Sequence, residues 1–350
     1  MQWPSEKRRE SELTCTDYER DKRNFAIILA VLLIVTLTLF FVSMCVGRYS
    51  VSLKDVAGFF IGQEIPDVSW RVLSYLRLPR TLLAMLVGCA LSVSGAVFQS
   101  AFNNKLVSPD FLGVSSGASV GACFAILLGL SNVLVSLLAF AAGCASVGLT
   151  VFVARIFRSR STVVLLLAGM AVGGLMSSGV GLMKYLADNE MKLAEMTYWL
   201  LGDLSGATMR DVRVMAAIAI VNCAVLILLS WRLNIISLGA RESKSLGIRY
   251  KANMLSFILA ATLLTAGAVS VSGTIGWIGV AVPNVMRLIA GSDNRKLLPA
   301  TMICGAAFML AVDTLARSIS PNEIPLSVIT GIIGTPLFVC AIFKKRKELG

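Results

Sequence analysis

Ten blocks of mostly apolar residues run along this 350-residue chain, each close to the length that crosses a lipid bilayer. A helix needs about 20 apolar residues to cross the hydrocarbon core. The blocks cover residues 25–46, 81–102, 114–131, 133–154, 162–183, 211–231, 252–271, 275–290, 298–319 and 326–343. Only 15% of the residues are charged, whereas a soluble domain usually carries about 25%. We therefore predict an all-α, polytopic membrane protein with a bundle of ten transmembrane helices.

The basic residues predict the orientation of these spans. Residues 1–24 are rich in charged side chains. The apolar block that follows them lacks the short apolar core and the cleavage site of a signal peptide. We expect a charged tail, residues 1–24, followed by one transmembrane domain, residues 25–350. With ten spans and an inner N-terminus, the inner segments carry 22 of the 32 lysines and arginines. Because inner loops are enriched in these residues, we expect both termini of this multi-pass protein to be cytoplasmic.

Several chemistries lack the residues that they need. The chain has no histidine, and its eight cysteines form no CxxC pair, so histidine-based catalysis and the common metal sites are excluded. No nucleotide-binding G-x-x-x-x-G-K-[ST] motif is present. The net charge of +12 reflects membrane topology rather than nucleic-acid binding. We expect a transport protein rather than an enzyme, with no bound metal or cofactor, driven by an ion gradient or by a separate subunit.

Two charged residues of the ninth block, Asp313 and Arg317, are four positions apart. Residues at this spacing are neighbours on a helix surface, so we expect an intramembrane ion pair. The alternative is an ion or proton site, which would make the chain an ion-coupled secondary transporter. A single carboxylate beside an arginine is a poor site for a coupling ion, and we favour the ion pair.

The inner segment 232–251 contains a short amphipathic pattern. Two leucines and three polar residues recur there at helical spacing: Leu238, Arg241, Glu242, Ser245 and Leu246. Gly239 and Gly247 bracket the stretch, as glycines often do at helix ends. The pattern predicts a short helix at the cytoplasmic surface, which could fit a groove on a partner. A solvated loop between helices is the alternative, and the pattern alone favours it.

Small residues and glycines indicate close helix packing and one break. Gly88 and Ser92, with Gly95 nearby, form one ridge of the kind that lets helices approach each other in lipid. The short glycine-rich stretch 273–283 predicts a broken or re-entrant helix. Outside the spans, the two long outer segments each contain a short amphipathic stretch, at residues 53–60 and 193–200.

Ten motifs follow one another along residues 48–343, beginning with Arg77-Leu-Pro-Arg80. They occupy residues 77–83, 93–99, 112–118, 165–169, 198–206, 237–247, 276–283, 291–299, 313–317 and 323–331. In this order and spacing they resemble the FecCD family of ABC importer permeases, which serve iron–siderophore, haem and vitamin B12 uptake. The resemblance implies ten helices per subunit, in agreement with the charge distribution.

The resemblance also implies partners. Such a permease works with a second permease copy or a close homologue, two cytoplasmic ATP-binding subunits that hold ATP and Mg²⁺, and an extracytoplasmic substrate-binding protein. By motif position, Arg77, Arg80 and Arg317 would receive acidic residues of that binding protein. Segment 234–248 would dock on the ATP-binding subunit. Its matching residues are Leu238, Gly239, Arg241, Glu242, Leu246 and Gly247. The cytoplasmic gate would involve Asn104, Leu106 and Thr162.

Three positions depart from the family pattern. Asn284 and Asn294 stand where the family commonly has histidine, and Lys105 stands where it has proline. Asparagine keeps the capacity for hydrogen bonding but does not titrate. We expect an iron–siderophore complex as the substrate because this is the commonest assignment in the family, with haem or cobalamin as alternatives.

Overall fold

Helices form all the regular structure that the computed structural model describes, which covers residues 3–47, 49–157, 162–320 and 323–347. Each predicted span corresponds to one helix. These are α1 (Trp3–Cys45), α4 (Leu78–Ala101), α5 (Val114–Leu127), α6 (Asn132–Ile156), α7 (Thr162–Tyr185), α9 (Met209–Leu228), α12 (Tyr250–Ser272), α13 (Ile278–Ala290), α14 (Asn294–Ile319) and α15 (Leu326–Lys347). Among the described helices, eight are long and apolar enough to cross a membrane, while α5 and α13 are apolar but shorter. The predicted all-α, ten-helix bundle is confirmed.

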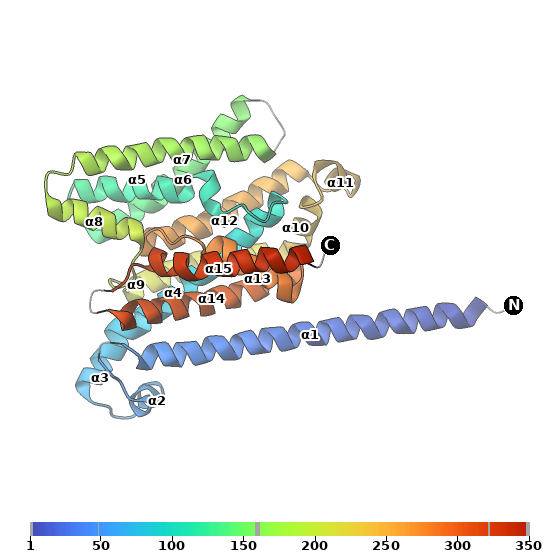
Figure 1. Cartoon of the computed structure of the whole chain (residues 1–350), viewed down its shortest axis with the longest axis horizontal. Helices are drawn as coiled ribbons and strands as arrows, with labels where there is room; N and C mark the ends of the chain where they lie inside the picture. The colour runs from blue at the N-terminus through green and yellow to red at the C-terminus, as the bar shows by residue number, and fades with distance from the viewer. Residues whose placement is uncertain (1–2, 48, 158–161, 321–322, 348–350) are drawn as a thin grey trace.

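Helix α4 is the most enclosed element of the bundle. In the most apolar 18-residue stretch of its span 83% of the residues are buried, against 6% in the corresponding stretch of α1, which lies along the rim (Figure 1). Gly88 and Gly95 let α4 approach α14 and α13, because a Cβ at Gly95 would lie 1.9 Å from the carbonyl oxygen of Gly279. The predicted packing role of this small-residue ridge is therefore confirmed.

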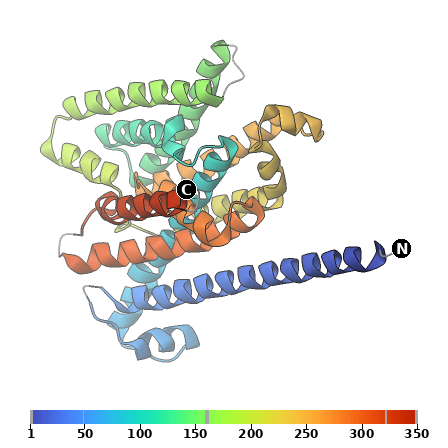
Figure 2. The same ribbon diagram turned by 45° about the vertical axis from the view of Figure 1, so that its right-hand side comes forward.

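Short helices gather at the two ends of the bundle. At one end lie α2 (Leu53–Ile61), α3 (Asp67–Arg71) and α8 (Glu190–Leu201), and we call this the α8 end (Figures 1 and 2). At the other end, called the α11 end, lie α10 (Ser230–Ile236) and α11 (Ala240–Ser245), together with the beginning of α1 and the end of α15. The two amphipathic stretches at residues 53–60 and 193–200 thus lie in α2 and α8, and α11 lies within the helical pattern at 238–246.

Two irregular segments interrupt the long helices. A π-helical segment, η1 (Val72–Arg77), joins α3 to α4. Pro79 follows it and has no N–H to donate, so the regular hydrogen-bond ladder cannot run unbroken through this turn. A short 3-10 helix, η2 (Pro109–Leu112), precedes α5. Between α12 and α13 the chain leaves the helical path at Gly273 and re-enters it at Ile278, which confirms the predicted helix break.

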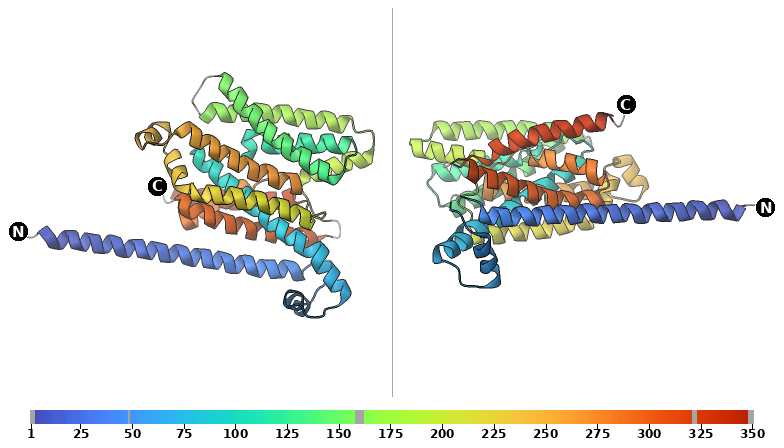
Figure 3. Two further views of the ribbon diagram at one scale, coloured as in Figure 1. Left: turned by 180° about the vertical axis from the view of Figure 1, so that it is seen from behind. Right: turned by 60° about the horizontal axis from the view of Figure 1, so that its bottom comes forward.

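The first half of α1 extends past the bundle at the α11 end (Figures 1 and 3). The described part of the charged tail, residues 3–24, is continuous with the first span. Lys296 of α14 pairs with Asp21 and so ties this extension to the bundle.

Candidate functional site

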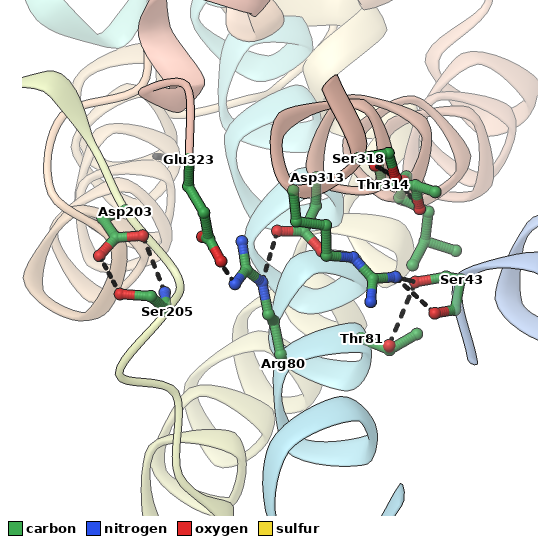
Figure 4. A network of polar contacts seen from close by, with 11 residues as sticks. Ser43, Arg80, Thr81, Asp203, Ser205, Asp313, Thr314, Ser318 and Glu323 are labelled. Atoms are coloured by element: carbon green, nitrogen blue, oxygen red, sulfur yellow. Dashed lines mark hydrogen bonds and ion pairs between the residues drawn. The ribbon is translucent and has the colours of Figure 1, made fainter. Parts of the chain in front are cut away.

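Arg80 lies between two carboxylates at the α8 end of the bundle. Its Nε is 2.8 Å from Oδ1 of Asp313 on α14, and its Nη1 is 2.9 Å from Oε2 of Glu323, just before α15 (Figure 4). The Asp313 side chain is fully buried. Because a buried carboxylate is costly unless it is paired, Arg80 fixes the start of α4 against the end of α14.

Arg317 completes this cluster from the last turn of α14. Its Nε lies 3.4 Å from Oδ2 of Asp313, at the i,i+4 spacing that the sequence predicted for an ion pair. Its Nη2 donates to Oγ of Ser43 at 2.6 Å and also to the Ser43 carbonyl oxygen. The ion pair is present, but Arg80 is the nearer partner of Asp313.

Arg77 has a different partner set, at the end of α1. Its guanidinium donates to the carbonyl oxygen of Cys45 at 2.8 Å and also to those of Met44 and Tyr49. The last carbonyls of a helix have no partners within the helix and carry partial negative charge. Arg77 therefore caps α1 and holds the turn that follows it.

All three predicted docking arginines, Arg77, Arg80 and Arg317, are between 5% and 8% exposed, and each has partners within the chain. The structure thus gathers them at one end of the bundle, where each binds groups of the chain itself. Their role in receiving a binding protein stays a prediction.

The predicted coupling segment, residues 234–248, forms the end of α10 and the whole of α11. Gly239, with a φ of +111°, precedes α11, and Gly247, with a φ of +75°, follows it. Between them Arg241 and Glu242 are exposed. Leu238 and Leu246 are 60% and 58% exposed. Two exposed leucines beside charged side chains make a surface that a partner groove could cover.

The predicted gate residues lie at two places. Asn104 and Leu106 are in the loop after α4, where the Asn104 side chain accepts a hydrogen bond from the Leu106 N–H at 3.0 Å. Leu106 is 55% exposed. Thr162 is the first residue of α7. Their role as a gate stays a prediction.

A hollow of about 450 Å³ was not anticipated from the sequence. It is bordered by η2, α5, α7 and the loop before α13. Six hydroxyl side chains line it: Ser115, Ser116, Ser119, Ser177, Thr274 and Ser327. Asp110 and Trp277 also line it, and no lysine or arginine does so among the described residues. Single serines in apolar blocks give little sequence signal, because their convergence depends on how α5, α7 and α15 pack.

Trp277 is an unusual residue of this hollow. Its φ of +69° lies in the left-handed region, which bulky residues rarely adopt. Gly331 and Gly334 of α15 face its ring and its Cβ, and a Cβ at Gly334 would lie 2.9 Å from the Cβ of Trp277. Two glycines thus leave room for the indole of Trp277, a residue that is 41% exposed.

Comparison with known proteins places these features in a family. The model of the FecCD transport family matches residues 32–344. The chain is 36% identical to the molybdate import system permease protein MolB of Haemophilus influenzae, over 91% of this chain and 95% of that protein. It is 33% identical to the hemin transport system permease protein HmuU of Yersinia pestis, over 92% of this chain and 97% of that protein.

A solved structure has a similar fold. An inward-facing metal-chelate type ABC transporter superposes with a TM-score of 0.83 at 35% identity. The match covers 91% of this chain and 99% of that one.

Proposed function

Since the chain belongs to the FecCD transport family, we propose that this ABC importer permease carries an iron–siderophore complex across the cell membrane. The family match over residues 32–344 is the observation that supports an importer permease. The two named relatives are described as permeases for molybdate and for hemin. Because these two substrates differ, the relatives do not fix the substrate of this chain.

The hydroxyl-lined hollow favours a bulky chelate over a small oxyanion. An oxyanion such as molybdate is best held by cations or backbone N–H groups, and no lysine or arginine among the described residues lines the hollow, whereas Asp110 does. Hydroxyl groups and an exposed indole instead offer weak contacts to a large polar ligand. The metal-chelate type of the solved neighbour agrees with this choice. Haem and cobalamin are the alternatives within the same family.

We assign one partner to each end of the bundle. In this proposal the α11 end faces the cytoplasm, and α11 docks on an ATP-binding subunit that holds ATP and Mg²⁺. Two such subunits serve two permease copies, and ATP binding moves the two coupling segments. The α8 end faces outward and receives the substrate-binding protein near Arg77, Arg80 and Arg317. The exposed Leu238 and Leu246 support the first contact, and the gathering of three arginines supports the second.

Asp313 is a poor candidate for a coupling-ion site. It is fully buried, yet Arg80 lies 2.8 Å away and Arg317 lies 3.4 Å away. Two neighbouring guanidinium groups leave no net negative charge to attract a cation. This arrangement favours an ATP-driven importer over an ion-coupled secondary transporter.

Uptake by the reconstituted importer tests the proposal. Proteoliposomes would be offered a ferric siderophore, hemin, cobalamin or molybdate in turn, with ATP inside or outside. We expect ATP-dependent uptake of the ferric siderophore that stops when the ATP-binding subunit cannot hydrolyse ATP. If molybdate were the only compound taken up, the proposed iron–siderophore substrate would be refuted. Uptake that persists with the inactive subunit and collapses with an ionophore would instead support ion coupling.

A further inference from the structure

A chain of hydrogen bonds leads from the coupling segment into the buried part of the bundle. Asn234 of α10 is the first residue of that segment. Its Nδ2 donates to Oδ1 of Asp293 at 2.6 Å. Its Oδ1 accepts from the backbone N–H of Asn294 at 2.9 Å and from Nδ2 of Asn294 at 2.7 Å. One asparagine thus binds the beginning of α14 through three hydrogen bonds.

Asn294 extends the chain to α4. Its Oδ1 accepts from Oγ of Ser100 at 2.7 Å, so its amide serves as donor on one side and acceptor on the other. Asn294 is 2% exposed and Ser100 is 8% exposed, so water does not compete freely for these groups. Ser100 lies in the last turn of α4, directly before the loop that carries Asn104 and Leu106.

Helix α13 holds the same region from its other side. Arg287 donates to Oε1 of Gln99 and, at 3.3 Å, to Oγ of Ser100. Asn284 donates to the carbonyl oxygen of Lys105 at 3.0 Å, within the loop after α4. No ion pair of Arg287 is found among the described residues, so its charge is stabilised by the hydrogen bonds that it donates to α4.

We propose that Asn234, Asn294 and Ser100 form a relay that carries the movement of the coupling segment to the gate loop after α4, with Arg287 and Asn284 holding that loop to α13. They are positioning residues, and the proposal rests on the proposed function, in which segment 234–248 docks on the ATP-binding subunit.

The physical reason is that the energy of a hydrogen bond falls steeply with distance. Helix shifts of about 1–2 Å are typical of switching transitions, and a hydrogen bond that lengthens by that amount is lost. When α10 shifts, the three bonds of Asn234 either break or draw the beginning of α14 along with it. The Ser100 hydrogen bond then transfers the shift to the end of α4. Buried apolar residues of α10, such as Leu233 and Ile236, still contact the bundle without the relay, but apolar contacts can slide.

The first test compares transport with ATP hydrolysis in the reconstituted importer. Asn234→Leu and Ser100→Ala remove the relay. Asn222→Leu is the matched control, because among the described residues the Asn222 amide donates to Ile218 alone, within α9. We expect Ser100→Ala, which lies outside the docking segment, to hydrolyse ATP at about the wild-type rate. In both relay variants the substrate carried per ATP should fall about tenfold, the scale of a few lost hydrogen bonds. The control should change neither quantity.

Two outcomes of this test would overturn the relay. Uptake and hydrolysis that fall in equal proportion would show that these residues serve stability or docking. An unchanged ratio in both variants would show that coupling runs through other contacts. Failure of the proposed function is distinguishable, because the wild-type chain would then neither co-purify with an ATP-binding subunit nor show ATP-dependent uptake.

A distance measurement tests the relay without transport. Spin labels at Lys244→Cys in α11 and Leu106→Cys in the gate loop, in a variant without the native cysteines, report how the two segments move together. With Asn234 in place, we expect the same narrow distance distribution with and without ATP. In Asn234→Leu we expect this distribution to broaden. A distribution that Asn234→Leu leaves narrow would contradict the relay.

Discussion

At the scale of single residues, Arg80 neutralises two carboxylates at the α8 end. It is the cation between Asp313 and Glu323, and both distances are below 3 Å. Removing one partner of a buried ion pair typically costs about 3–5 kcal/mol. We expect Arg80→Gln to lower the Tm of the purified chain by several degrees, because Asp313 loses its nearest cation. Thermal unfolding in detergent measures this, with the exposed Arg213→Gln as a control that should leave the Tm unchanged.

The double variant Arg80→Gln/Asp313→Asn separates charge from packing. It removes the buried carboxylate together with its cation, so we expect it to be more stable than Arg80→Gln alone. If the double variant were the less stable of the two, the pair would not be coupled as the distances indicate.

Glu323 provides a second test at the scale of residues, because its carboxylate already pairs with Arg80 within the same chain. An acidic residue of the binding protein that uses Arg80 has to compete with this carboxylate. We therefore expect Glu323→Gln to tighten binding of the binding protein by up to about fivefold, the scale of a partly exposed ion pair. Titration of binding protein onto the importer in nanodiscs measures this affinity. Unchanged or weaker binding would show that Arg80 is not the docking residue.

Sequence reasoning could predict the local ion pair but not its larger cluster. Asp313 and Arg317 share one helix turn, so their spacing alone places them together. Arg80 and Asp313 are 233 positions apart, and only the packing of α4 on α14 brings them into contact. The same limit hid the Asn234–Asn294 contact and the hydroxyl-lined hollow, since each depends on how separate helices converge.

At the scale of elements, the contact between α4 and α13 depends on the absence of a side chain at Gly95. A Cβ there would lie 1.9 Å from the Gly279 carbonyl oxygen, closer than any tolerable contact. We expect Gly95→Ala to destabilise the chain by about 1–3 kcal/mol, because the two helices must move apart. Gly181→Ala on α7 is the matched control, since a Cβ at Gly181 would have nothing within 4 Å. Chemical unfolding of both variants decides the point, and equal stabilities would contradict it.

The long elements were predictable because hydropathy and helix length express one physical requirement. In a bilayer every backbone polar group has to be hydrogen-bonded within the segment, so a long block of apolar residues that crosses it forms a helix. The π-helical turn before α4 was not predictable in this way. It lies directly before Pro79, and its last residue, Arg77, binds the end of α1, a contact between distant segments that local sequence does not reveal.

At the scale of the whole molecule, a cluster of polar contacts lies at each end of the bundle. At the α8 end, Arg80, Asp313 and Glu323 join α4, α14 and the start of α15. At the α11 end, the relay from Asn234 to Ser100 joins α10, α14 and α4. Helices α4 and α14 take part in both clusters. A shift of α14 against α4 would therefore change the two ends together, which is what alternating access between them requires.

Orientation in the membrane is the prediction that belongs to the whole chain. Arg241, Lys244 and Arg249 follow α10 at the α11 end, so the enrichment of basic residues in inner loops predicts that this end is cytoplasmic. In a variant without native cysteines, we expect Lys54→Cys in α2 to react with a membrane-impermeant maleimide in intact cells. Lys244→Cys in α11 should react only after permeabilisation. Both positions are exposed, so a failure to label reflects the membrane barrier rather than burial. The reverse pattern would invert the assignment of both partners, placing the binding protein at α11 and the ATP-binding subunit at the arginine cluster.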